Sequence, residues 1–243
     1  MRLWIDTDIG DNPDDAVALL CACAHPNVEL VGVSTTGGRT EWRAELARQV
    51  VEVPVIPGES IDVLADTFGK AEPEAVLAIG PLTSVAALVA VGIAFPPITV
   101  MGGALFPVEH RGRVQTVEFN FARDPAAAAI VVARSDATIV PLDVTVTMRL
   151  DAQQVDRLVH ADARLAPEVA RWQAAFDDPL VLHDPLALLS CVGEPVVTSE
   201  HRMLEVDAHD GRLRVTERGC DHAVVVDVDA HAAIHRLLEL LGA

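Results

Sequence analysis

The chain opens with an apolar run, Leu3-Trp4-Ile5, followed at once by Asp6-Thr7-Asp8-Ile9-Gly10-Asp11-Asn12-Pro13-Asp14-Asp15. These ten residues carry five carboxylates, and the nearest cation, Arg2, lies at the far end of the apolar run. Carboxylates this close raise one another's pKa unless a positive charge lies among them, and hard divalent cations prefer oxygen ligands. The stretch therefore predicts a metal site on the loop between a first strand and a first helix. The alternative is an acidic helix start favoured by the helix dipole, which accounts for one or two of the aspartates.

Composition limits the class of protein and of partner. With 243 residues, 51% of them hydrophobic, the chain can form one large α/β domain, and we expect residues 1–243 to be that single domain. The net charge of −18 argues against a nucleic acid or an anionic membrane as the partner. A small neutral substrate, or one held through a bound cation, suits this charge.

The remaining bulk features predict a cytoplasmic protein. No signal peptide precedes the first strand. The longest apolar stretch, residues 84–101, is interrupted by a glycine and two prolines, so we expect a buried helix and then a strand rather than a membrane span. Four cysteines without C-x-x-C spacing are typical of reduced core residues, not of a zinc site or disulfides: Cys21, Cys23, Cys191 and Cys220.

Strand and helix patterns alternate along the whole chain. Strands are expected at Leu3–Ile5, Glu29–Ser34, Ala75–Ile79, Ile98–Met101, Ala137–Val140 and Ala223–Val228, with a hairpin of His201–Val206 and Arg212–Thr216. Helices are expected at Asp14–Ala24, Glu41–Val51, from Thr83 through Val91, at Asp124–Arg134, 151–159, 165–176, 184–191 and Ala230–Leu241. Short apolar strands that alternate with helices predict an α/β fold: an open, mainly parallel sheet with helices on both faces.

Four loops rich in Gly, Thr and Asp follow predicted strands. Ligands bind at the carboxyl ends of the strands in open parallel sheets. These loops are therefore expected to converge on one crevice, and they are residues 6–15, 35–39, 80–83 and 101–103.

A further segment, Leu182-His183-Asp184-Pro185-Leu186-Ala187, places a histidine and a carboxylate at the start of a helix. Pro185 suits the first turn of that helix. Taken alone, the pair is more often a capped helix start than a catalytic dyad.

Together these segments resemble the nucleoside hydrolases, the inosine–uridine-preferring N-ribohydrolase family, in order and over nearly the whole chain. The resemblance implies a Rossmann-like α/β fold. It is carried by Asp6-Thr7-Asp8 with Asp14-Asp15, Gly80-Pro81-Leu82-Thr83, Met101-Gly102-Gly103, Glu118-Phe119-Asn120 leading into Asp124-Pro125, Pro141-Leu142-Asp143-Val144-Thr145, and His183-Asp184-Pro185.

The resemblance implies Ca²⁺-dependent hydrolysis of the N-glycosidic bond of a ribonucleoside or related N-riboside by a homo-oligomer, a dimer or a tetramer. By this resemblance the Ca²⁺ ligands would be Asp8, Asp15, Asp184 and the backbone carbonyl of Thr83. The ribose would contact Asp14, Glu118, Asn120 and Met101. Asp8 would act as the general base, and His183 is the candidate acid because an unperturbed histidine titrates near neutrality.

Several positions depart from the family pattern. Five residues, Ile9–Pro13, separate Asp8 from Asp14, where the commoner family loop is shorter, and the family's His-Gly element is missing. A family asparagine appears here as Arg39, and another has no clear counterpart near Arg111-Gly112-Arg113. If Arg39 and Arg113 (or Arg111) lie at the mouth of the sugar site, they predict a substrate with an anionic group, such as a 5′-phosphate.

Alternative interpretations remain open at this point. The two arginines can instead pair with nearby acids such as Glu41 or Glu109. Trp172 and Phe176, four residues apart on a predicted helix, can stack on a leaving base, although packing in the core is favoured. Lys70, the only lysine, is placed in a polar loop without a role.

Two other functions compete with the hydrolase. A haloacid-dehalogenase-like phosphohydrolase would use Asp6 as the nucleophile and Asp8 as the acid/base, but it lacks a well-placed lysine and leaves His183-Asp184 unexplained. A non-catalytic nucleoside or ribose binder would keep Ca²⁺ without turnover, but binding alone needs neither a base nor an acid. The hydrolase is therefore preferred.

Overall fold

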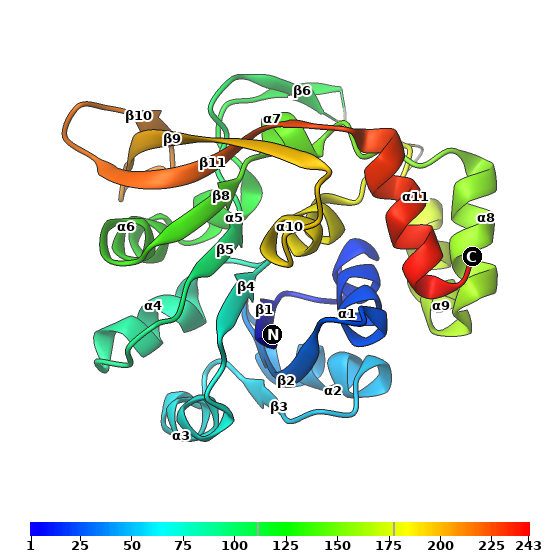
Figure 1. The fold of residues 1–243 in the computed structure, drawn as a ribbon, viewed down its shortest axis with the longest axis horizontal. Helices are drawn as coiled ribbons and strands as arrows, with labels where there is room; N and C mark the ends of the chain where they lie inside the picture. The colour runs from blue at the N-terminus through cyan, green and yellow to red at the C-terminus, as the bar shows by residue number, and fades with distance from the viewer. Residues whose placement is uncertain (111, 177) are drawn as a thin grey trace.

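The computed structural model describes residues 1–110, 112–176 and 178–243. Its centre is a nine-stranded sheet with the order β10-β9-β11-β8-β5-β4-β1-β2-β3 (Figure 1). Seven strands from β11 to β3 are mutually parallel, whereas β9 and β10 pair antiparallel at one edge. The strands are β1 (Arg2–Thr7), β2 (Glu29–Thr35), β3 (Val55–Pro57), β4 (Ala75–Ala78), β5 (Ile98–Met101), β8 (Ala137–Val140), β9 (Val197–Val206), β10 (Leu213–Val215) and β11 (Cys220–Val228). The predicted open, mainly parallel α/β sheet is confirmed.

Helices cover both faces of this sheet (Figure 1). One face packs against α1 (Asp14–Ala24), α2 (Thr40–Val50), α8 (Ala152–Ala161), η1 (Ala163–Leu165), α9 (Ala166–Ala175), α10 (His183–Cys191) and α11 (Ala230–Leu241). The other face packs against α3 (Ile61–Ala71), α4 (Thr83–Ala90), α5 (Phe119–Arg123) and α6 (Pro125–Arg134). The short helix α7 (Leu142–Thr145) follows β8, and a separate hairpin pairs β6 (Val108–His110) with β7 (Arg113–Gln115).

Alternation along β1 divides the core into two apolar layers. Leu3 and Ile5 join the cluster beneath α1 and α10, whereas Trp4 joins the cluster beneath α3 and α4. All three side chains are at most 1% exposed. A strand buried on both faces reads as a continuous apolar run, and this is why residues 3–5 mark the middle of the sheet.

The first helix begins and ends where the sequence predicts. Pro13 precedes α1, and its ring pre-sets a helical φ of −71°. His25 leaves the helix with an extended backbone because Pro26 follows it. These limits hold Asp14 and Asp15 in the first turn of α1, directly after the acidic loop.

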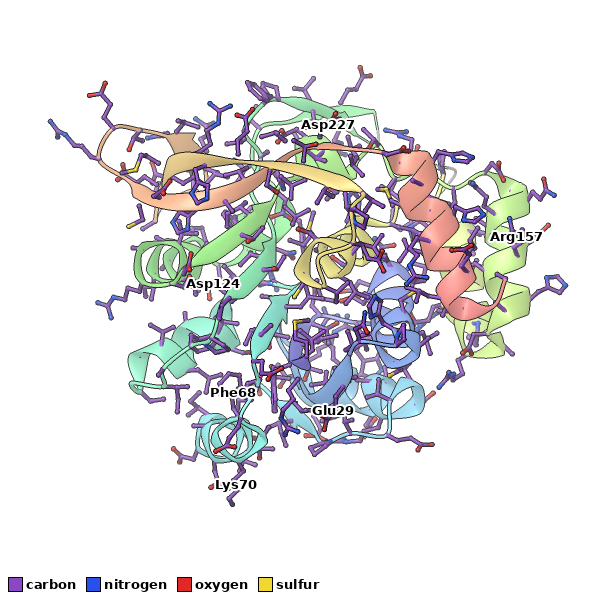
Figure 2. All side chains as sticks on the ribbon, in the orientation of Figure 1. Glu29, Phe68, Lys70, Asp124, Arg157 and Asp227 are labelled. Atoms are coloured by element: carbon purple, nitrogen blue, oxygen red, sulfur yellow. The ribbon has the colours of Figure 1, made fainter. Side chains whose placement is uncertain are left out.

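Several elements depart from the prediction. β3, α3, α5, α7 and the β6–β7 hairpin were not expected. Lys70 was wrongly placed in a polar loop, because it lies in the last turn of α3 and pairs with Asp66 at 2.6 Å. Phe68, two residues before Lys70, is buried, and Figure 2 shows Phe68 and Lys70 on this same helix at the margin of the molecule.

The cysteine prediction holds only in part. Cys21 is buried, as expected of a core residue, but Cys23 and Cys220 are exposed. Residues 84–101 do form a helix followed by a strand, α4 and β5. Within the described ranges, no helix has both the length and the apolar character needed to cross a bilayer.

Candidate active site

A cavity of about 320 Å³ lies beyond the carboxyl ends of β1, β4 and β5. Five of the six segments that carry the family resemblance contribute residues to its wall. It is lined by Asp8, Asp11, Asn12, Asp14, Asp15, Ile79, Met101, Gln115, Glu118, Phe119, Asn120, Leu142, Phe176, His183 and Asp184.

The predicted strand-end loops meet around Asp8. A Cβ added to Gly80 would lie 2.9 Å from the Asp8 backbone nitrogen, and one added to Gly37 would lie 3.1 Å from the Asp8 Cβ. The Thr36 hydroxyl donates to the Pro81 carbonyl at 2.7 Å and so joins those two loops. Glycine is required at both contacts because a side chain would displace Asp8.

Helix α1 holds two carboxylates at the base of the cavity. Thr7, the last residue of β1, donates its hydroxyl to Asp15 Oδ1 at 2.5 Å. Asp14 Oδ2 accepts the backbone N–H groups of His183 at 3.2 Å and Asp184 at 3.4 Å. The start of α1 is therefore tied to the start of α10.

Three buried carboxylates, from Asp14, Asp15 and Asp184, offer ligand atoms that all lie within 4.8 Å of one another. Burial, reinforced by the neighbouring carboxylates, raises the pKa of Asp15 and of Asp184 well above the ordinary value. Asp14 Oδ1 is buried and has no hydrogen-bond partner among the described residues. Such a set of oxygen donors fits a hard divalent cation, which would supply the missing positive charge.

Asp8 lies beside this cluster rather than within the tight triplet of ligand atoms. It lines the same cavity, and its charge contributes to the raised pKa values of Asp15 and Asp184. Burial raises the pKa of Asp8 to about 7, even though the Arg43 guanidinium lowers it. The resemblance predicted Asp8, Asp15 and Asp184 as the aspartate ligands. In the structure, the three carboxylates whose ligand atoms lie closest together are those of Asp14, Asp15 and Asp184.

The opposite wall is fixed by Glu118, which caps helix α5. Its carboxylate accepts backbone N–H groups of Asn120 at 2.7 Å and of Phe121 and Gly103 at 3.1 Å. Burial raises its pKa to about 7 despite these three donors. The Asn120 amide donates to the Met101 carbonyl at 3.1 Å. One compact unit thus presents Glu118, Asn120 and Met101 to the cavity.

His183, the first residue of α10, is 8% exposed and lines the cavity. Its Nδ1 lies 2.8 Å from the hydroxyl of Thr145, the last residue of α7. Thr145 belongs to the resemblance motif but received no role from the sequence. The contact fixes the orientation of the imidazole ring at the cavity wall.

Three predicted site residues do not line the cavity. Thr83 begins α4, and its hydroxyl donates to Asp124 at 2.5 Å. Arg39 donates to Asp11 at 3.0 Å, so it pairs with an acid as the alternative interpretation held, although not with Glu41. Arg113 is exposed in β7; Arg111, named beside it, lies outside the described residues.

The two aromatic residues near His183 differ in exposure, although the centres of their rings lie only 5.9 Å apart. Trp172 is 6% exposed and packs in the core, whereas Phe176 is 40% exposed and lines the cavity. The sequence did not single out Gln115 or Phe119 as wall residues, because their positions depend on the β6–β7 hairpin. Arg43 was also missed, although an arginine on the buried face of α2, one turn before Ala47, is a detectable signal.

Comparisons with known proteins agree on one family. The family model described as inosine-uridine preferring nucleoside hydrolase matches residues 45–235. Pyrimidine-specific ribonucleoside hydrolase RihA of Photobacterium profundum is 23% identical, over 98% of this chain and 97% of its own. Uridine nucleosidase 1 of Arabidopsis thaliana is 24% identical, over 85% of this chain and 78% of its own.

Solved structures show the same fold. The plant nucleoside hydrolase PpNRh1 superposes with a TM-score of 0.82 at 21% identity, covering 100% of this chain and 99% of its own. The purine-preferring ribonucleoside hydrolase from Gardnerella vaginalis also gives 0.82, at 20% identity, covering 99% and 98%.

The matching family and its named relatives place this chain among the N-glycosyl hydrolases. The chain belongs to the inosine-uridine preferring nucleoside hydrolase family. This membership overturns the phosphohydrolase alternative, and the non-catalytic binder is likewise set aside because the family is one of enzymes.

Proposed function

We propose that this protein hydrolyses the N-glycosidic bond of a ribonucleoside or related N-riboside and releases ribose and the free base. One observation carries the proposal: a single cavity gathers five aspartates, Glu118, Asn120 and a buried histidine. Such a wall combines ligands for a cation, acceptors for sugar hydroxyls and groups able to move protons.

The cation that we propose is Ca²⁺, held by the carboxylates of Asp8, Asp15 and Asp184, with Asp14 adjacent to it. The donor set is made of oxygen atoms only, which Ca²⁺ prefers. When bound, the cation would supply positive charge among the carboxylates and a Lewis acid for sugar hydroxyls and water.

The residues of the chain divide the reaction between them. The carboxylates of Asp14 and Glu118 accept hydrogen bonds from ribose hydroxyls, and the Asn120 amide can both donate and accept. Together they hold the sugar against Met101. Asp8 takes a proton from the attacking water. The C1′–N bond breaks through an oxocarbenium-like sugar, and the surrounding carboxylates stabilise its developing positive charge.

His183 would donate the proton that the departing base requires. In the imidazolium both ring nitrogens carry protons, so Nδ1–H donates to the Thr145 hydroxyl while Nε2–H gives its proton to the base, which leaves a neutral ring protonated on Nδ1. Phe176 offers an aromatic face to the base from the same side of the cavity.

A substrate panel tests the proposal. Purine and pyrimidine ribonucleosides and p-nitrophenyl riboside are incubated with the protein and Ca²⁺, and release of ribose is measured. We expect turnover of at least one nucleoside. Cleavage of phosphate esters with no riboside hydrolysis would overturn the assignment.

Asp8→Asn is the matching variant, because it keeps the shape of the side chain and removes the base. We expect kcat to fall by roughly 10²–10⁴-fold on every riboside with the thermal unfolding midpoint little changed. Activity close to the parent's would remove Asp8 from the mechanism.

The proposal extends to three further features: location, assembly and the charge of the substrate. Four free cysteines suit a reducing cytoplasm. The exposed side chains of Phe106 and Val114 suit a homo-oligomer, which sedimentation would measure. Comparing kcat/KM for a nucleoside and its 5′-monophosphate tests the anionic-substrate hypothesis attached to Arg39 and Arg113.

A further inference from the structure

The loop that carries Asp8 rests directly on helix α2. Ile9 is fully buried, and Gly10 has a φ of +118°. A Cβ added to Gly10 would lie 2.6 Å from the Trp42 ring and 2.7 Å from Leu46. The longer loop is therefore not free in solvent, because its first half packs against two side chains of α2.

A single guanidinium holds this loop from beneath. Arg43 is the one buried arginine or lysine among the residues that the structure describes. Its Nη1 donates to the backbone carbonyls of Asp8 and, at 2.8 Å, of Ile9, and its Nε donates to the Gly38 carbonyl at 3.0 Å. Two loops at the floor of the site are thereby joined through one side chain.

Asp11 completes the arrangement at the cavity mouth. Its Oδ2 accepts from Arg43 Nη2 at 2.7 Å, and its Oδ1 accepts from Arg39 Nη2 at 3.0 Å. The guanidinium of Arg39 in turn lies 4.4 Å from the centre of the Trp42 ring. The longer loop and Arg39, which the sequence presented as separate departures, form one connected network.

We propose that Arg43 and Asp11 are positioning residues that set the backbone of Asp8 and so hold its carboxylate toward the cation site. The inference rests on the proposed function, because it assumes that Asp8 serves a bound cation. Arg43 itself does not line the cavity. Its planar fork satisfies several acceptors in fixed directions at once, which an ammonium group cannot do.

Position and charge predict different results for substitutions at Arg43. If Arg43 mattered only as a positive charge, removing it would tighten the binding of a cation, and Arg43→Lys would change nothing. If Arg43 sets the loop, both Arg43→Gln and Arg43→Lys weaken cation binding. Groups that orient metal ligands typically contribute about 10–100-fold in metal affinity.

Calcium binding to the intact, metal-free protein is measured by isothermal titration calorimetry. We expect Kd for Ca²⁺ to rise by about 10–100-fold in both Arg43 variants, and kcat on p-nitrophenyl riboside to fall more than KM changes. Arg48→Gln is the matched control, since Arg48 is an exposed arginine of the same helix. Unchanged or tighter Ca²⁺ binding in Arg43→Gln overturns the proposal.

Asp11→Asn provides a second variant at a position that is half exposed and leaves no buried cavity. We expect weaker Ca²⁺ binding at both low salt and 1 M NaCl, where the Debye length is about 3 Å and distant charges are screened. If Asp11→Asn and the parent bind Ca²⁺ equally well at 1 M NaCl, Asp11 acts only through its charge, and the proposal is overturned. If the Arg43 variants do not fold, Ca²⁺ binding by Asp11→Asn at the two salt concentrations tests the positioning role by itself.

The two proposals fail in distinguishable ways. A parent protein that binds Ca²⁺ but hydrolyses no riboside contradicts the proposed function, while the calorimetry still reports on the loop. A parent that hydrolyses ribosides, with variants that bind Ca²⁺ equally well, contradicts only the positioning role.

Discussion

Among single residues, Thr145 gives the most direct test of how the leaving base is protonated. Thr145→Val removes the hydroxyl beside His183 Nδ1 at nearly constant volume. We expect kcat on nucleosides to fall about tenfold or more, a part of the roughly 10²–10⁴ that a positioned acid contributes. Hydrolysis of p-nitrophenyl riboside should change little, because nitrophenolate leaves without a proton.

Thr145→Ser serves as the control, since it restores a hydroxyl at the same position. Both substrates are assayed side by side with both variants. Equal losses on nucleosides and on the nitrophenyl compound would mean that Thr145 supports the fold rather than the acid.

The residues of the cavity differ in how far sequence predicts them. Asp14 and Asp15 belong to the crowded carboxylates that indicate a site, whereas Asp184 was identified only through the family resemblance. Arg43 was not, because its role depends on the register between α2 and a loop 35 positions earlier. That register is set by packing, which no local pattern of residues encodes.

For the elements, the contact between β1 and β2 predicts a strong effect of a small change. A Cβ added to Gly32 in β2 would lie 2.2 Å from the ring of Trp4 in β1, which is 1% exposed. Gly32→Ala should therefore lower the free energy of unfolding by about 1–3 kcal/mol, the usual cost of overpacking a core.

Gly69→Ala is the matched control on helix α3, where an added Cβ meets nothing within 4 Å. Alanine is favoured over glycine inside a helix, so this variant should gain about 1 kcal/mol. Urea unfolding measures both variants. A Gly32→Ala protein as stable as the parent would contradict the packing described for β1 and β2.

The turn between α10 and β9 predicts a dependence of stability on pH. Glu194 accepts from His25 at 3.0 Å and from Arg236 at 2.9 Å, and so ties this turn to α1 and α11. Partial burial alone would raise the pKa of Glu194, but the hydrogen bonds from Arg236 and His25 lower it below the ordinary value. The stabilisation is therefore present at neutral pH and is lost as pH falls through the lowered pKa.

Glu194→Gln should cost about 1–2 kcal/mol of unfolding free energy at pH 7, as for hydrogen bonds to a charged group. The difference from the parent should shrink below about pH 4, where the carboxyl is protonated in the unfolded chain. Chemical denaturation at several pH values measures it, and a gap that stays constant with pH would contradict the assignment.

Secondary elements were predictable where several residues agree in pattern. The limits of α1, β5, β8 and α11 were predicted as observed. The strand β3 was missed because it has three residues, lies at an edge and ends in Pro57. Helix α3 was missed although its apolar residues recur at helical spacing, and Leu64 and Phe68 on that face pack in the core.

At the scale of the whole molecule, the buried acids predict how the metal-free protein responds to pH. Burial raises the pKa of Asp6 to about 8, of Asp8 and Glu118 to about 7 and of Asp14 to about 6. Groups with raised values stabilise the fold most when they are neutral. Their contribution is thus complete below about pH 4 and is lost as pH rises through 6–8.

In the presence of a chelator, the thermal unfolding midpoint should therefore decrease as the pH is raised from 5.5 to 8. Excess Ca²⁺ should restore it at pH 8, because binding to the folded state adds stability by mass action. Differential scanning calorimetry with EDTA and with Ca²⁺ compares the two. The same slope against pH in both buffers would mean that these carboxylates do not hold the cation.

The hydrogen bonds from α10 to Asp14 span 170 positions of the chain. Ribosomes add about 5–20 residues per second, so the acidic loop is made roughly 10–30 s before its partner helix. Until then the aspartates lack the amides that orient Asp14 and the carboxylate of Asp184. The chain can therefore bind the metal only after α10 has been synthesised. A nascent chain arrested before residue 183 should retain no ⁴⁵Ca²⁺ on a filter.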